Sequence, residues 1–172
     1  MGTRGLLGFI IRSSQRHAAY NHFDSYPTGL GKKIVEFILS LTTEEYDIMA
    51  RLVSEITWVE YESTPSLDLQ ERYQNAGFAN ITYYHDGTAS KWHCLLHNTQ
   101  GAPALRAIRS GALQHMVENI SFLEEGMFCE WSYFIDFEGR KLETWEDTQK
   151  VDVVSFETLV KVGKGYMDHL EE

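Results

Sequence analysis

The fold is decided near the start of the chain, at Leu6-Leu7-Gly8-Phe9-Ile10-Ile11. A continuous apolar run of this length is typical of a buried strand. The polar residues Ser13-Ser14-Gln15 can turn the chain, and residues 17–23 can return as the partner strand. The sequence therefore predicts an N-terminal β-hairpin whose first strand is buried.

Three helices are expected after this hairpin. Residues 32–41 place their apolar side chains on one helical stripe. Thr42 and Glu45 have the spacing of a capping box, which predicts the start of a second helix. Thr64-Pro65 predicts a third helix that runs to Gln74, because proline is favoured at the first helical position.

The second half of the chain predicts two further hairpins and three further helices. The hairpins are residues 80–84 with 91–96, around His85-Asp86-Gly87, and residues 127–137 with 141–145, around Glu138-Gly139. The helices are residues 103–108, residues 112–119 and a last helix capped by Ser155. Because strands and helices come in clusters, we expect a single α+β domain, residues 1–172, with a mainly antiparallel sheet of hairpins packed with helices.

The charge of the chain narrows the class of partner. The 172 residues carry 15 Lys and Arg against 25 Asp and Glu, a formal charge of −10. Nucleic-acid-binding proteins usually present a basic face, so this balance disfavours nucleic acid. The apolar run at residues 6–11 is too short for a membrane span. We expect a polar small molecule as ligand, and a protein partner or a homo-oligomer stays open.

The cysteines and histidines predict neither a disulfide framework nor a metal site. Cys94 and Cys129 lie in apolar contexts and are expected as buried, reduced thiols, which suits the cytoplasm. His93 and His97 on a strand would lie about 13 Å apart, too far for one ion. No metal and no cofactor are therefore predicted.

The densest group of polar and aromatic residues is the segment from Tyr20 to Pro27, at the expected end of the second strand. His22 and Asp24 are two residues apart, so on an extended chain they project to the same face. Asp24 could then orient the His22 ring as a general base. The alternative is that Asp24 and its polar neighbours only form a turn.

A second candidate is Glu130, inside the expected strand 127–137. There it would share a face with Phe128 and Phe134. A carboxylate in apolar company is costly unless it is paired, and Arg4 is the expected partner. The pair would either fix the strand register or form the charged floor of a cleft, with Glu130 as a catalytic acid.

Five further residues complete the candidate site. Tyr20 and Tyr26 would wall it, Asn21 and Asn98 would donate hydrogen bonds to the substrate, and His97 would face the cleft.

Two resemblances add to this reading. Thr3 at the head of a first strand, followed by a hairpin bearing Asn21 and Asp24, resembles the entry of N-terminal-nucleophile hydrolases and implies a layered fold. Those enzymes need a free amine on the nucleophile itself, whereas Met1 and Gly2 precede Thr3. This departure puts catalysis by Thr3 in doubt.

The chain also resembles a family of small proteins from phages, actinobacteria and fungi for which no activity is assigned. The resemblance covers most of the chain and rests on Met1-Gly2-Thr3-Arg4-Gly5, Tyr20-Asn21-His22-Phe23-Asp24-Ser25-Tyr26-Pro27, Gly29-Leu30-Gly31, Cys94-Leu95-Leu96, Asn98-Thr99-Gln100-Gly101 and Phe128-Cys129-Glu130-Trp131. It implies that these segments belong together, as a shared cleft or as a shared folding nucleus.

These observations lead to two hypotheses. The first is a small cytoplasmic enzyme, hydrolytic or cyclising, that acts on a polar small molecule by His/Asp acid–base chemistry. The alternative is a non-catalytic protein that sequesters a ligand or binds a protein partner through its acidic surface.

Overall fold

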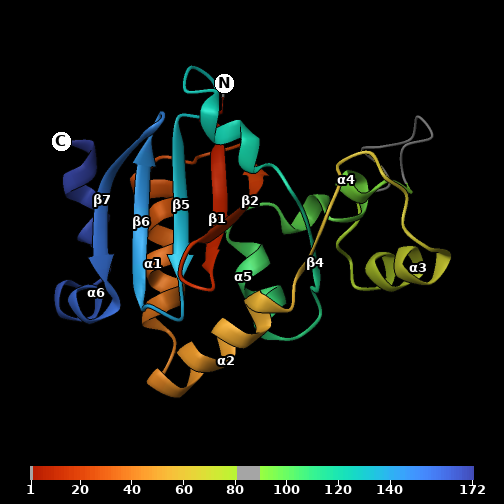
Figure 1. Cartoon of the computed structure of the whole chain (residues 1–172), viewed down its shortest axis with the longest axis horizontal. Helices are drawn as coiled ribbons and strands as arrows, with labels where there is room; N and C mark the ends of the chain where they lie inside the picture. Colours follow the sequence, from red (N-terminus) through yellow and green to blue (C-terminus); the bar gives the residue numbers. More distant parts are fainter. Residues whose placement is uncertain (1, 81–89) are drawn as a thin grey trace.

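The computed structural model describes residues 2–80 and 90–172. Its main sheet has five strands in the order β2-β1-β5-β6-β7 (Figure 1). The strands are β1 (Gly5–Ile11), β2 (Gln15–Asn21), β5 (Trp131–Asp136), β6 (Lys141–Glu146) and β7 (Gln149–Ser155). Neighbouring strands are antiparallel except β1 and β5, which are parallel. The predicted α+β class is confirmed, with a mixed sheet.

The predicted N-terminal hairpin forms, but its turn lies at residues 12–14 and its second strand at Gln15–Asn21 rather than at residues 17–23. β1 pairs with β2 from Gly5 opposite Asn21 to Ile11 opposite Gln15. Arg12 and Ser13 make the turn with positive φ angles of 52° and 64°. All seven residues of β1 are buried, because β1 lies between β2 and β5 and both of its faces are covered.

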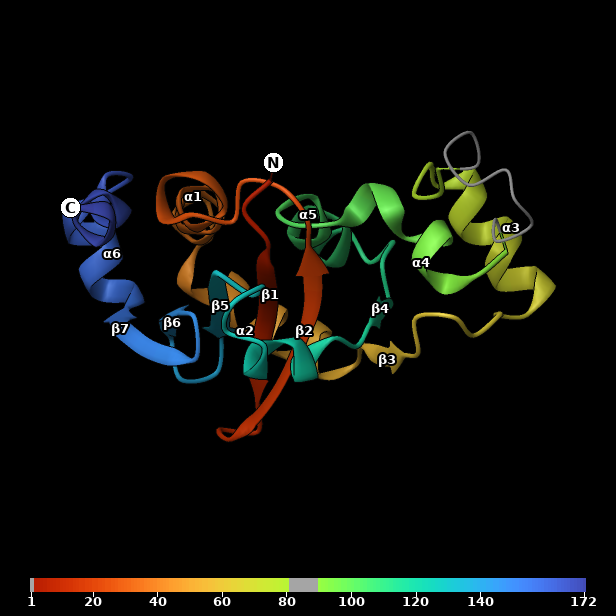
Figure 2. The ribbon, with the colours of Figure 1, turned by 90° about the horizontal axis from the view of Figure 1, so that it is seen from above.

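Helices cover one face of the sheet, and Figure 2 shows α1, α5 and α6 in a row above it. The helices are α1 (Lys32–Leu39), α2 (Thr43–Ser54), α5 (Pro103–Arg109) and α6 (Phe156–Val162), with the short helical segments η1 (Pro27–Gly31) before α1 and η4 (Tyr166–Glu171) at the end. The capping box of Thr42 and Glu45 and the cap at Ser155 are both present. One hydrophobic cluster joins these helices to Leu7 and Phe9 of β1.

A smaller layer covers part of the opposite face. The 3-10 segment η3 (Ile120–Glu124) packs on β1 and β2 there, over Leu6, Ile10 and Ala18 (Figure 2). Among the described elements, no helix lies over β6 and β7 on this face (Figure 1).

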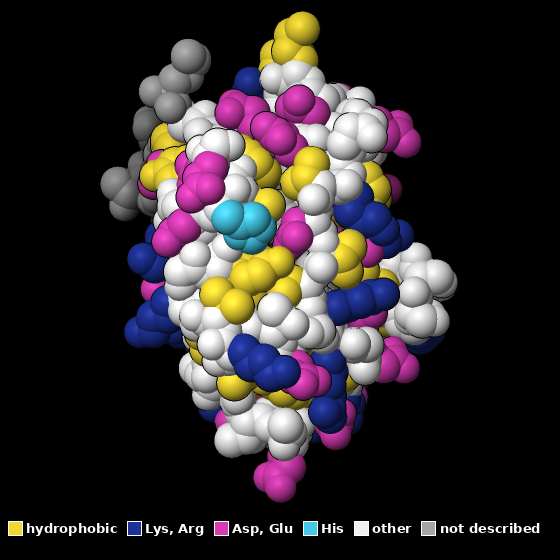
Figure 3. Space-filling model, turned by 90° about the vertical axis from the view of Figure 1, so that its left-hand side faces the viewer, with side chains coloured by type: hydrophobic (Ala, Val, Ile, Leu, Met, Phe, Trp, Pro, Cys, Tyr) yellow, Lys and Arg dark blue, Asp and Glu magenta, His cyan; other side chains and the backbone are white. Residues whose placement is uncertain are grey.

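The β7 end of the sheet is the edge farthest from β2. Figure 3 faces this edge and shows apolar side chains interspersed with charged ones. Val151 and Val153 of β7 are about half exposed there, as are Val160 and Val162 of α6. Val160 is an apolar residue of α6 that points to solvent, at 60% exposure.

The remaining elements extend the molecule beyond β2. They are the short parallel strands β3 (Thr57–Val59) and β4 (His115–Val117), the helices α3 (Leu67–Asn75) and α4 (Trp92–Leu95), and the 3-10 segment η2 (His97–Thr99). Trp58 of β3 stacks on His17 of β2, with ring centroids 5.0 Å apart. The main hydrophobic cluster continues through Tyr73 of α3 and Trp92 of α4, so this extension shares one core with the sheet.

Four predicted elements need correction. The expected strand 91–96 is absent, and Trp92–Leu95 form α4 instead, because a short apolar run fits either structure and only length and context separate them. Its expected partner strand and turn lie almost wholly outside the described residues. Residues 112–119 contain β4 rather than a helix, since residues 115–117 pair with β3. The third helix begins after Ser66, whose hydroxyl accepts from the Leu69 N–H, and not at Pro65.

The fourth correction concerns the expected strand 127–137, which begins only at Trp131. The N–H groups of Phe128 and Cys129 both donate to the carbonyl of Glu125, so a turn precedes the strand. Glu130 therefore does not share a strand face with Phe128 and Phe134.

The burial of both cysteines is confirmed. In the described part of the chain, no helix combines the length and the apolar character that a bilayer crossing requires.

Candidate functional site

A large cleft opens where β2 ends and α5 begins. Its volume is about 810 Å³, and six of the nine predicted site residues line it: Tyr20, Asn21, His22, Asp24, His97 and Asn98. We call this hollow the His22 cleft. The residues that sequence reasoning did not place in the site are Phe23, Leu30, Lys33, Tyr61, His93, Gln100, Gly101, Ala102, Pro103 and Asn119.

The His22 ring is held at the mouth of this cleft. Its Nδ1 atom lies 2.6 Å from the Tyr20 hydroxyl, and its backbone N–H donates to Oε1 of Gln100 at 3.0 Å. The ring also meets Phe23 edge-on, with centroids 4.4 Å apart. These contacts fix the imidazole, although the residue itself is exposed.

Tyr20, and not Asp24, is the group in contact with His22. The chain is extended up to the end of β2 at Asn21, so His22 and Tyr20, two residues apart, project to the same face. The alternation of side chains does not continue from His22 to Asp24, because Asp24 adopts a left-handed conformation with φ of 54°. Asp24 nevertheless lines the same cleft, and its carbonyl accepts from the Leu30 N–H at 2.8 Å.

The two asparagines hold the loops of the cleft together. Asn21 donates both amide hydrogens within its own loop, to the Phe23 carbonyl at 2.7 Å and to the Ser25 hydroxyl at 2.8 Å. Asn98 donates to the carbonyls of Gly77 at 3.1 Å and Ala79 at 3.2 Å. Their amide hydrogens are therefore engaged by the protein, and a substrate would meet only their oxygens.

His97 lies within electrostatic reach of His22. Burial, and then the neighbouring His22, lower the pKa of His97 below its ordinary value.

A second imidazole, His93, stacks on Tyr61 with ring centroids 4.3 Å apart and planes 8° apart. His93 and His97 lie on α4 and η2 rather than on one strand, so the separation of about 13 Å expected on a strand does not hold for them. Within the described ranges, no three His, Cys, Asp or Glu side chains are grouped so that they could hold a metal ion.

A smaller, mainly apolar hollow adjoins the cleft. It holds about 60 Å³ and shares Tyr20, Tyr61, His93, Gln100, Gly101 and Asn119 with the cleft. Its own walls are Leu7, Ala19, Leu96, Thr99, Met116 and Val117. A ligand in the cleft thus has polar groups on one side and space for a small apolar group on the other.

Three predicted site residues lie elsewhere. Arg4 and Glu130 meet through the backbone, where the Glu130 N–H donates to the Arg4 carbonyl at 2.9 Å. The Arg4 guanidinium lies over the Phe128 ring, 5.0 Å from its centroid. Among the described residues their side chains form no ion pair with each other, and neither they nor Tyr26 line the His22 cleft.

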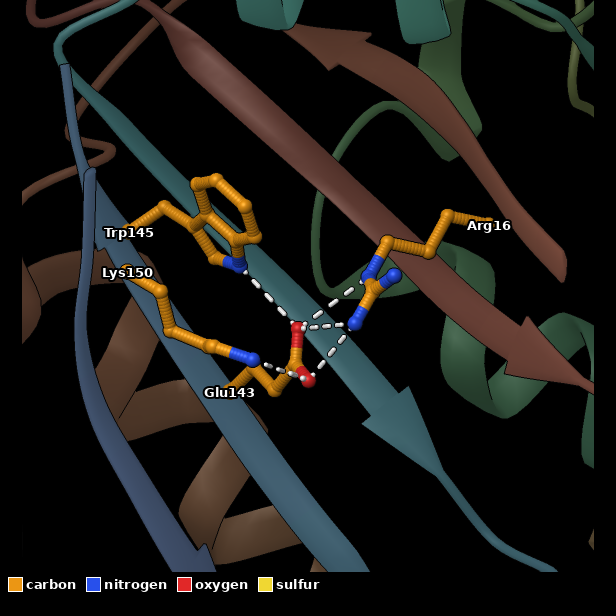
Figure 4. A network of polar contacts seen from close by, with 4 residues as sticks. All are labelled: Arg16, Glu143, Trp145 and Lys150. Atoms are coloured by element: carbon orange, nitrogen blue, oxygen red, sulfur yellow. Dashed lines mark hydrogen bonds and ion pairs between the residues drawn. The ribbon is translucent and has the colours of Figure 1, made fainter. Parts of the chain in front are cut away.

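Glu143 of β6 is a buried carboxylate with basic partners, and Asp136 of β5 is buried as well. Glu143 is 2% exposed and accepts from three residues on the open face of the sheet: Arg16, Trp145 and Lys150 (Figure 4). The contacts from Arg16 are 2.8–3.2 Å, that from Trp145 is 3.1 Å and that from Lys150 is 3.4 Å. We call these four residues the carboxylate network.

Opposing influences act on the acidity of Glu143. Burial alone raises the pKa of the Glu143 carboxyl, but the hydrogen bonds from Arg16 and Trp145 and the charges of Arg16 and Lys150 outweigh it. The pKa is therefore held below its ordinary value, and the group is ionised at neutral pH. A buried acid with a basic partner was expected, but it occurs at Glu143 and not at Glu130.

Comparison with known proteins adds no family or relative, since no protein-family model, curated protein or solved structure matches the chain.

Proposed function

We propose that the protein is an enzyme that acts on a polar small molecule, by a hydrolytic or cyclising reaction in which His22 transfers protons. The observation that supports this proposal best is the 2.6 Å contact between the Tyr20 hydroxyl and Nδ1 of His22, at the mouth of a cleft of about 810 Å³. Clefts of this size that combine apolar walls with a few polar groups are typical of small-molecule sites.

The Tyr20 hydroxyl can serve both protonation states of the ring. Burial raises the pKa of Tyr20, so the phenol stays protonated and can donate to Nδ1, which leaves the proton of neutral His22 on Nε2. A hydroxyl can also accept, so in the other neutral tautomer Nδ1–H donates to Tyr20 and the Nε2 lone pair is free to take up a proton, which gives an imidazolium that can return it. His22 can therefore act at Nε2 as acid or as base.

His97 supports the same chemistry. Because the pKa of His97 is lowered, this imidazole is neutral at neutral pH and can accept a proton. Two imidazoles in different environments around one cleft can provide an acid and a base. Asp24 and Lys33 add one negative and one positive charge to the walls.

The burial of Cys94 and Cys129 suits a reducing compartment, so we place the reaction in the cytoplasm.

The test compares the wild-type protein with His22→Ala. Each is incubated with a metabolite extract, and consumed compounds are identified by mass spectrometry. We expect the substitution to reduce turnover about 10²–10⁴-fold, the usual contribution of a general acid or base. Melting temperature should hardly change, since His22 is exposed. His169→Ala, another exposed histidine on η4, is the control and should leave turnover intact.

The outcomes separate the two classes of function. Equal turnover by wild type and His22→Ala would contradict the proposal. A compound that is retained by the wild-type protein but never converted would favour a ligand-sequestering protein instead. If His22→Ala unfolds the protein, His22→Gln repeats the measurement with a side chain of similar size.

A further inference from the structure

A second hollow lies between α1 and α5, beside the His22 cleft. Its volume is about 930 Å³, and its walls are Lys33, Glu36, Phe37, Ser40, Ala102, Pro103, Arg106, Arg109 and Ser110. We call it the basic groove. Figure 2 shows the two helices side by side above the sheet.

The charge of this groove is opposite to that of the whole chain. Its walls carry three basic residues, Lys33, Arg106 and Arg109, against one acidic residue, Glu36. The chain as a whole has 15 basic against 25 acidic residues. A local excess of positive charge in a hollow concentrates anions there, even when the net charge of the protein is negative.

Two of the three basic side chains are not engaged by acids. Arg109 forms an ion pair with Glu45 of α2. Lys33 and Arg106 form no ion pair with any residue that the structure describes. They come from different helices, α1 and α5, so a ligand between the helices could meet both.

The basic groove and the His22 cleft adjoin each other. Lys33, Ala102 and Pro103 line both hollows. Lys33 therefore stands at the junction, and one molecule can reach from the His22 ring into the groove.

From this arrangement we infer that the basic groove binds an oxyanion group, a phosphate or a carboxylate, between Lys33 and Arg106. This inference rests on the proposed function in one respect: the anionic group belongs to the molecule whose other end lies in the His22 cleft. The substrate class is then a small organic anion. Ammonium and guanidinium groups make charge-assisted hydrogen bonds with such oxygens, which are stronger than neutral ones.

The first experiment measures binding of two probes, inorganic pyrophosphate and citrate, by calorimetry at low ionic strength. The two probes distinguish a phosphate from a carboxylate preference. In Lys33→Gln/Arg106→Gln the dissociation constant should rise about tenfold or more, since a hydrogen bond to a charged group is worth at least one factor of ten. Added salt should weaken binding to the wild-type protein, because the groove is open to solvent.

Two further variants make the test specific. Lys161→Gln/Lys164→Gln removes the same charge from the C-terminal part of the chain, on exposed residues outside the groove, and should bind the probe like the wild type. Glu36→Gln removes the one acidic residue of the groove and should bind the probe more tightly. A change of the opposite sign at Glu36 cannot arise from loss of folding.

The inference is overturned if neither probe shows saturable binding at millimolar concentration, or if both double variants weaken binding equally. Its failure is separable from that of the proposed function. His22→Ala should bind the probe with unchanged affinity. If the probe binds but His22→Ala turns over as fast as the wild type, the anion site in the groove stands and the proposed enzymatic function fails. If His22→Ala loses turnover but the wild-type protein binds neither probe, the proposed function stands and the anion site fails.

Discussion

The carboxylate network and the His22 cleft each contain a polar side chain next to the main sheet, Glu143 and His22. The two side chains differ in their exposure to solvent and in how many of their polar atoms bond within the protein. Glu143 is 2% exposed, and both its oxygens accept from donors within the protein. His22 is exposed, and Tyr20 engages only one of its ring nitrogens. A polar group whose bonds are all made internally fixes the fold, whereas one with a position left open can meet a ligand.

The largest effect on stability is expected when the carboxylate network loses its main donor. Arg16→Met should lower the free energy of unfolding by about 3 kcal/mol, because it leaves a buried carboxylate without its best partner. Urea denaturation measures the change. The double variant Arg16→Met/Glu143→Leu should recover most of the loss, since it removes the buried charge as well. If the double variant is no more stable than Arg16→Met, the burial of Glu143 is not the cause.

The next effect concerns the frame of the His22 cleft. Gly101 has φ of 79°, and a Cβ atom added there would lie 2.6 Å from Oδ1 of Asn21. Gly101→Ala should cost about 2 kcal/mol, from the left-handed backbone and from this close contact. Gly111→Ala is the control, because Gly111 has φ of 83° but no atom within 4 Å of the added Cβ. It should cost about 1 kcal/mol on the same urea curves. Equal losses of stability in the two variants would show that the Asn21 side chain moves aside at little cost in free energy.

A smaller effect, on turnover rather than on stability, is expected from the hydroxyl that holds His22. Tyr20→Phe should reduce turnover about tenfold and change its pH profile, because Nδ1 of His22 loses the hydroxyl that it contacts. Tyr61→Phe removes a hydroxyl from the same cleft and is the control. Equal pH profiles for wild type and Tyr20→Phe would separate Tyr20 from the chemistry.

The smallest effect is the acid sensitivity of the carboxylate network. The pKa of Glu143 is lower in the folded protein than its ordinary value, so its contribution to stability is present above the ordinary pKa. This contribution is lost as the pH falls through the folded-state pKa. Unfolding free energy measured across the acid range should therefore fall less steeply in Glu143→Leu than in wild type. Parallel curves would mean that other carboxyl groups dominate the acid response.

Much of the fold could be predicted because its signals are local. The apolar run of β1, the turn that includes Ser13 and Ser14, and the caps at Thr42 and Ser155 each depend on a few neighbouring residues. The errors arose where one pattern fits two structures. α4 is a short apolar run, and β4 gains its hydrogen bonds from β3, which lies far away in the sequence.

The candidate site was predicted in part for the same reason. The segment around His22 was identified because polar and aromatic residues follow a strand. The alternation rule was applied to Asp24, past the end of the strand, and not to Tyr20, within it. Gln100 lies 78 residues from His22, and Lys33 joins the cleft from α1, so no local pattern relates them to His22.

The sequence by itself determined the buried first strand, the caps of the helices and the concentration of polar residues after β2, since each depends on backbone geometry over a few residues. Only the tertiary structure decided that Arg16 meets Glu143 across 127 residues and that Lys33 lies between a cleft and a groove. Such encounters depend on how the sheet and helices pack. Packing sums many weak contacts between distant residues, which no short stretch of sequence contains.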